Sequence, residues 1–87
     1  MELKFTFKNT KKSTVLIKYA NNKLIKLIEK YATKPIEAHL IIHPEGREFH
    51  ILCHVVGGDN FNYEVKANGV DLLGALDVIL EKLDKKM

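Results

Sequence analysis

Lysine is the residue type whose spacing in this sequence points most directly to a chemical function. Lys23, Lys26 and Lys30 recur at intervals of three and four residues. On a helix, where each residue turns by about 100°, they fall within an arc of about 60°. Like charges at this spacing repel one another, a cost that a row of lysines facing phosphates would explain. Lysine stems lying over an apolar core are the structural alternative.

The distribution of charge along the chain favours the same kind of partner. The 87-residue sequence carries a net charge of only +3. Residues 1–34 contain nine lysines and two glutamates, whereas residues 35–87 contain five basic and nine acidic side chains, so the two parts carry +7 and −4. This asymmetry indicates a polyanionic partner for the first part, with a lysine-rich solvated surface as the alternative.

Four histidines are the next candidates, and they fall on two segments that alternate apolar and polar residues. A turn centred on Glu45 and Gly46 would pair residue 39 with 52 and residue 43 with 48. All four histidines would then point outward from one sheet face, with His39, His50 and His54 in a loose triangle. That face would hold His39, Ile41, His43, His50, Leu52 and His54.

The histidine face admits three interpretations. Zinc needs several ligands at about 2 Å, and with only one cysteine the sequence predicts neither a metal site nor any cofactor. A contact surface for RNA or for a protein partner, more positive at low pH, is the second interpretation. Exposed histidines on a sheet without a ligand are the third, and the sequence favours this one.

Residue types suited to catalysis do not come together. Cys53 and His54 are neighbours in the sequence, but on a strand they point to opposite faces, with Cys53 on the buried one. Gly57-Gly58 is not followed by a helix, as a phosphate-binding loop requires. We therefore expect no enzyme and no small-molecule substrate.

Alternation of apolar residues predicts the strands that position these side chains. The first strand covers residues 2–8, and three more follow Lys34-Pro35, separated by turns at 44–47 and 57–60. A break is expected at Asn68-Gly69. The apolar faces of the four strands are Leu3, Phe5 and Phe7; Ile36, Ala38, Leu40 and Ile42; Phe49, Ile51, Cys53 and Val55; and Phe61, Tyr63, Val65 and Ala67.

Apolar residues at steps of three and four predict two helices. The first begins at the N-cap Ser13 and runs to about Ala32, because Pro35 prevents its continuation. The second begins at Val70 or Asp71 and runs nearly to the end of the chain. The expected apolar stripes are Leu16, Ala20, Leu24, Leu27 and Tyr31 on the first helix, and Leu72, Ala75 or Leu76, Ile79, Leu80 and Leu83 on the second.

These elements predict a single α+β domain over residues 1–87, a two-layer sandwich of order β-α-β-β-β-α. Both helices should cover one face of a four-stranded sheet, with the first two strands parallel and the hairpins antiparallel. No apolar run approaches the roughly 18 residues of a membrane span. The N-terminus also lacks a signal-peptide core, and the single cysteine favours a cytoplasmic protein.

The last helix resembles a known family. Residues 71–85 read Asp-Leu-Leu-Gly-Ala-Leu-Asp-Val-Ile-Leu-Glu-Lys-Leu-Asp-Lys. This is similar to Asp-Met-Tyr-x-Ala-Ile-Asp-x-Leu-x-Asp-Lys-Leu-x-Arg of the ribosome hibernation-promoting factors, also called ribosome-associated inhibitors or sigma-54 modulation proteins. In the first helix, Leu16-x-x-Tyr19-x-x-x-Lys23-Leu24-x-Lys26-Leu27 resembles the family's Leu-x-x-Phe/Tyr-x-x-x-Lys-Phe/Leu-x-Lys-Leu. The order of elements agrees too, and the chain looks like the family's short form or a fragment of a longer member.

The resemblance implies a translation inhibitor of stressed cells that binds the small ribosomal subunit near its decoding region. By position it implicates Lys23, Lys26, Lys82 and Lys85 in contacts with ribosomal RNA. Lys30 extends the first row, and Lys86 joins the last turn of the second helix. The lysines in that turn also complement the helix dipole. Leu73, Gly74 and Asp84 depart from the family pattern.

Two other binding functions stay open at this point. A protein-interaction module on the same scaffold could have lost ribosome binding and use the outward histidine face as its contact surface. A double-stranded-RNA-binding domain has a similar element order, although the second helix lacks the N-terminal lysine cluster with which that fold grips phosphates.

Overall fold

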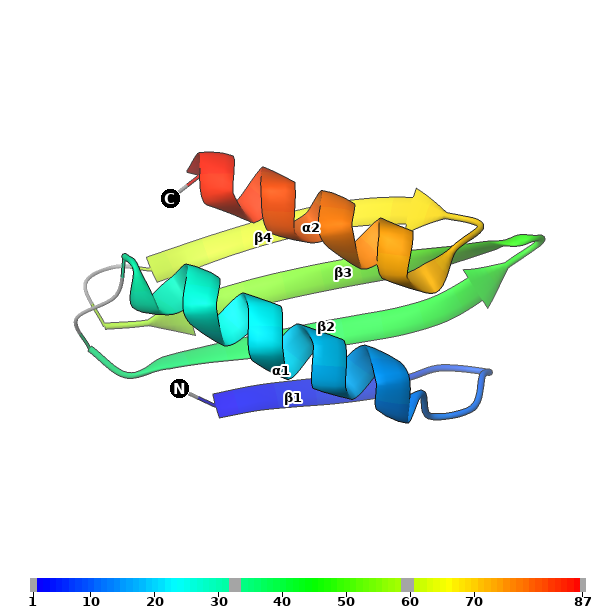
Figure 1. Ribbon diagram of the computed structural model, residues 1–87, viewed down its shortest axis with the longest axis horizontal. Coiled ribbons are helices and arrows are strands. Elements are labelled where there is room, and N and C mark those ends of the chain that lie inside the picture. Colours follow the sequence, from blue (N-terminus) through cyan, green and yellow to red (C-terminus); the bar gives the residue numbers. More distant parts are fainter. Residues whose placement is uncertain (1, 32–33, 59–60, 87) are drawn as a thin grey trace.

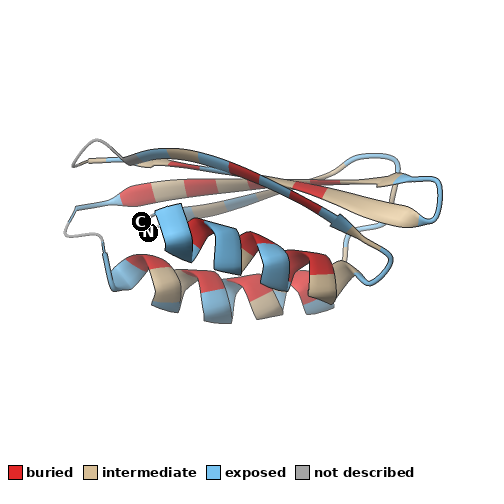
Figure 2. Ribbon diagram, turned by 90° about the horizontal axis from the view of Figure 1, so that it is seen from above, coloured by how far each residue is buried: buried red, intermediate tan, exposed pale blue. Residues whose placement is uncertain are grey.

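The computed structural model describes residues 2–31, 34–58 and 61–86. Its sheet has the strand order β1-β2-β3-β4, with β1 parallel to β2 and the other neighbours antiparallel. The two helices run in the same direction on one face of the sheet and leave the other face open (Figures 1 and 2). The elements are β1 (Glu2–Phe7), α1 (Thr14–Glu29), β2 (Ile36–Glu45), β3 (Glu48–Gly57), β4 (Phe61–Gly69) and α2 (Leu72–Lys86). The predicted two-layer α+β sandwich is confirmed.

The core lies between the helices and the sheet. Alternate residues of β2 from Ile36 to Ile42 are buried, as the two-residue period of a strand requires. On α1 the buried residue near the C-terminal end is Ile28, whereas Leu27 is half-buried and the predicted core residue Tyr31 is 39% exposed. The buried residues of α2 are Ala75, Leu76, Ile79 and Leu83. Neither helix within the described residues is long and apolar enough to cross a membrane.

The ends of α1 and β4 differ from the prediction. Helix α1 ends at Glu29 with Lys30 as its C-cap, short of the predicted end at Ala32, which lies outside the described residues. Its last turn tightens into bonds between residues three apart, because Tyr31 N donates to Ile28 O at 3.0 Å. Strand β4 runs through the predicted break at Asn68-Gly69, since these residues still pair with β3.

The hairpin between β2 and β3 has a different register from the predicted one. Its loop is only Gly46-Arg47, with Gly46 at φ 64°, a conformation that suits glycine. His39 therefore pairs with His54, and His43 with His50. Each partner is shifted by two residues, and an even shift keeps every side chain on its predicted face. The expected triangle of histidines is wrong, and two cross-strand pairs replace it.

Candidate nucleic-acid interface

Helix α1 is fixed at its start and along its buried side. Ser13 is the N-cap, and its hydroxyl accepts a hydrogen bond from the Leu16 backbone N–H at 3.1 Å. Leu16, Ala20, Leu24 and Ile28, four residues apart, are buried against the sheet. The opposite side of the helix therefore faces solvent, and Lys23, Lys26 and Lys30 are exposed there. We call these three residues the α1 lysines.

A tyrosine joins the α1 lysines to the neighbouring helix. The Tyr19 hydroxyl donates to Asp77 Oδ1 at 2.5 Å, and the Lys23 Nζ lies 6.0 Å from the centre of the Tyr19 ring. The hydrogen bond to the Asp77 carboxylate raises the pKa of Tyr19, because ionisation would remove the donated proton. The ring of Tyr19 also packs against the core, so this residue serves the pairing of the two helices.

A second contact of the same kind lies near the other end of the helices. The Tyr31 hydroxyl donates to Asp84 Oδ1 at 2.7 Å, and Lys30 Nζ lies 5.6 Å from the Tyr31 ring centre. This hydrogen bond likewise raises the pKa of Tyr31. Asp84 and Asp77 are two helical turns apart and hence on the same side of α2. In the sequence, Asp84 is only a departure from the family pattern. The structure shows that it accepts a hydrogen bond from Tyr31, just beyond the end of α1.

The remaining predicted lysines, those of α2, lie beside β4. Lys82 Nζ donates to the Lys66 carbonyl oxygen at 2.7 Å, and Lys85 pairs with Glu81 at 3.3 Å. With Lys86, these side chains line a hollow beside β4. Lys82, Lys85 and Lys86 are named the α2 lysines. Lys66, an outward residue of β4, joins this hollow and was missed, although strand alternation alone would have placed it on the surface.

The six predicted lysines therefore form two groups. Within the described part of the chain, none of the α1 lysines pairs with a carboxylate, whereas Lys85 does and Lys82 is engaged by a backbone carbonyl. The side of α2 that faces α1 carries Asp77 and Asp84. Of these two groups, the α1 lysines are therefore the one whose positive charge is not offset by a direct carboxylate partner among the described residues.

The open face of the sheet carries the histidines, as predicted. His39 Nε2 is 2.8 Å from Thr6 Oγ1, and His54 Nε2 is 2.9 Å from Asn62 Oδ1. In the described ranges no three histidine, cysteine or acidic side chains are grouped as metal ligands. Cys53 lies on the buried side of β3, where desolvation raises the pKa of its thiol to about 12.

Comparison with known proteins identifies a matching family and solved structures with the same fold. Residues 3–87 match the protein family described as sigma 54 modulation protein / S30EA ribosomal protein. The N-terminal domain of Protein Y from Thermus thermophilus has the same fold, with a TM-score of 0.87 and 20% identity over 99% of this chain and 94% of that one. A ribosomal subunit interface protein from Coxiella burnetii gives a TM-score of 0.84 and 17% identity over 99% and 92%. No curated protein matches the sequence.

Proposed function

The chain belongs to the sigma 54 modulation protein / S30EA ribosomal protein family, and from this premise we propose that it is a ribosome-associated translation inhibitor. In this proposal residues 1–87 form one ribosome-binding domain that acts in the cytoplasm of stressed cells. It binds ribosomal RNA of the small subunit near the decoding region. No covalent step is involved, because occupying the path of messenger and transfer RNA is enough to stop initiation.

The observation that carries this proposal is the exposed row of α1 lysines. They stand on a helix whose other side is held by buried side chains, so their spacing is set before any partner arrives. They also have no carboxylate partner among the described residues. A preset row of exposed ammonium groups suits a phosphate backbone, which then releases its condensed counterions on binding.

The α2 lysines supply a second and weaker contact in this proposal. Lys82 and Lys85 already have intramolecular partners, and a phosphate would have to compete with them. Lys86 has no such restraint among the described contacts. The chain would therefore bind RNA chiefly through α1, with α2 adding charge along the edge of the domain.

Co-sedimentation with purified small ribosomal subunits tests the proposal. Between about 50 and 200 mM salt, the affinity should fall with a slope equivalent to roughly 4–6 neutralised phosphates. No affinity at the lower salt concentration, or an affinity independent of salt, would overturn RNA binding and favour a protein-interaction module. Preferential binding to plain RNA duplexes over the subunit would instead favour a double-stranded-RNA-binding function.

A further inference from the structure

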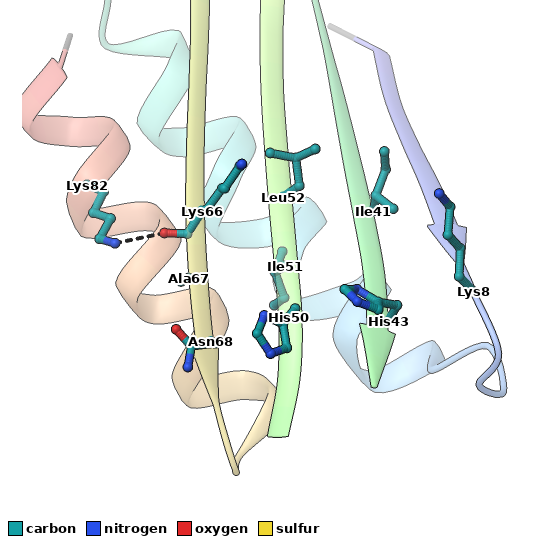
Figure 3. A pocket seen from close by; sticks show the side chains of 10 residues that line it. All are labelled: Lys8, Ile41, His43, His50, Ile51, Leu52, Lys66, Ala67, Asn68 and Lys82. Atoms are coloured by element: carbon teal, nitrogen blue, oxygen red, sulfur yellow. Dashed lines mark hydrogen bonds between the residues drawn. The ribbon is translucent and has the colours of Figure 1, made fainter. Parts of the chain in front are cut away.

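The open face of the sheet contains a concavity on the side away from the layer of helices. Its volume is about 580 Å³. The strand register places two transverse rows of outward side chains beneath it. One row is Thr6, Ile41, Leu52 and Lys66, and the next is His43, His50 and Asn68, with Lys8 beside β2 just beyond the end of β1 (Figure 3).

The floor of this concavity is apolar and aromatic. Ile41 and Leu52 are direct cross-strand partners on the two central strands. Next to them, the rings of His43 and His50 have their centres 5.3 Å apart and their planes tilted by 42°. Aliphatic and imidazole groups on the central strands of a four-stranded sheet offer a platform on which a planar base can stack.

The rim of the concavity is cationic. Lys8 stands at the β1 side and Lys66 at the β4 side, both exposed, with the platform between them (Figure 3). No carboxylate lines the concavity among the described residues, and neither of these lysines has an ion pair there. Lys82 also lines this concavity, but its ammonium group donates a hydrogen bond to the Lys66 carbonyl oxygen.

We propose that this concavity binds a nucleotide, with the base on the Ile41–Leu52 and His43–His50 platform and the phosphate on a rim lysine. The nucleotide can be free or a unit of single-stranded RNA, because both present the same base and phosphate. The site lies on the opposite face of the sheet from the α1 lysines, so it adds a second ligand to the proposed ribosome-binding function and does not depend on it.

Glu45 gives this proposal a distinctive test. Its Oε2 lies 3.8 Å from His43 Nε2 and 3.4 Å from His50 Nε2. A carboxylate at this position repels an incoming phosphate and holds the two imidazoles. Glu45→Gln should therefore raise nucleotide affinity about twofold, whereas a residue that only stabilises the hairpin would not act in this direction.

Titration of the ¹⁵N-labelled protein, followed by NMR at neutral pH, reads out the site. The probes are uridine 5′-monophosphate and a six-residue oligouridylate, with uridine and inorganic phosphate as component controls. Chemical-shift changes of the backbone amides should cluster at Ile41, His43, His50, Leu52 and Lys66, and those of α1 should stay unchanged. A response to the monophosphate identifies a free-nucleotide site, and a response to the oligonucleotide alone identifies a single-stranded RNA site. No clustered shift with either probe, or equal shifts with inorganic phosphate, overturns the proposal.

Two matched double variants complete the test. His43→Ala with His50→Ala should weaken nucleotide binding at least about fivefold through lost stacking. His39→Ala with His54→Ala removes the neighbouring cross-strand pair on the same face and should change affinity less than about twofold. Equal losses in both variants would overturn the assignment, provided that both melt cooperatively. Co-sedimentation of the first variant with small subunits should stay at the parental level, which separates this site from the α1 lysines.

Discussion

At the scale of single residues, the strand face on which a side chain lies determines whether it is exposed and can react. Cys53 and His54 are adjacent, yet Cys53 is fully buried and His54 is exposed. The sequence predicted this division because side chains on a strand alternate with a period of two. It could not predict that His39 would contact Thr6 or that Glu45 would approach both His43 and His50, since those contacts depend on pairing between strands.

Cys53 should be chemically silent in the native protein. Burial raises the pKa of its thiol from 9.0 to about 12, so at pH 8 almost none is the reactive thiolate. Iodoacetamide followed by mass spectrometry should show no labelling until urea unfolds the chain. Above pH 9 the unfolded chain loses this proton while the native state keeps it, so stability should fall as pH rises towards 12. Rapid native labelling at pH 8 would contradict the assigned burial.

The histidines should differ in their importance for stability. His39→Ala removes the part-buried contact with Thr6 and should lower the free energy of unfolding by about 0.5–1.5 kcal/mol. His54→Ala, at an exposed position, should change it by less than about 0.5 kcal/mol. Urea titrations measure both changes in the free energy of unfolding.

Zinc should leave the melting temperature of the parental protein unchanged. A large rise with zinc, lost in the His39→Ala variant, would reveal a metal site.

At the scale of elements, the existence and type of each helix and strand follow from the periodicity of its apolar residues. The exact ends of the elements and the pairing register of the strands depend instead on local contacts. All six predicted elements are present. The end of α1 was placed too late because Tyr31 extended its apolar stripe in the sequence, while in the structure it lies beyond the helix and bonds Asp84. The hairpin register was displaced because Pro44 suggested a four-residue turn, whereas β2 continues through Glu45.

The Tyr19–Asp77 bond should influence RNA affinity through charge. Asp77→Asn keeps a carbonyl oxygen as acceptor for the Tyr19 hydroxyl but removes a negative charge beside the α1 lysines. Affinity for the small subunit should rise about two- to threefold at low salt, and less at high salt. Filter binding measures the affinity, with Glu2→Gln, at an exposed position of β1, as the control of equal charge change.

Tyr19→Phe breaks the same hydrogen bond but keeps the charge of Asp77. It removes the donor and leaves the Asp77 carboxylate without this hydrogen bond, so affinity should not rise. The melting temperature should fall slightly, since an exposed pair contributes little. An increase in affinity for Tyr19→Phe equal to that of Asp77→Asn would show that the charge of Asp77 is not what limits RNA binding.

At the scale of the whole molecule, the fold places a helix from the basic part of the chain beside a helix from the acidic part. The first 34 residues carry +7 and the remainder −4, and the two helices lie together on one face of the sheet (Figure 2). The sequence predicted this asymmetry and the layer that bears it. It also separated the first-helix lysines from those of the second helix. It could not predict the rotation of α2 that turns Asp77 and Asp84 towards α1, because that rotation depends on tertiary hydrogen bonds.

This division of the lysines predicts that α1 dominates ribosome binding. Lys23→Glu with Lys26→Glu reverses charge where no carboxylate compensates it among the described residues, and should weaken small-subunit binding at least about tenfold. Lys82→Glu with Lys85→Glu should weaken binding less. That variant should also lower stability slightly, because it loses the bond to the Lys66 carbonyl and the pair with Glu81 and opposes the helix dipole.

A third double variant separates position from net charge. Lys11→Glu with Lys12→Glu changes the total charge equally but lies in the connection before α1, so its effect should fall between no change and the loss caused by the α1 variant. Circular dichroism distinguishes lost binding from unfolding, since charge reversals at exposed positions normally cost little stability. If the α1 variant bound small subunits and inhibited translation at parental levels, the α1 lysines would not be the RNA contact. If all three variants lost binding equally, attraction by net charge, and not a positioned row of lysines, would account for the affinity.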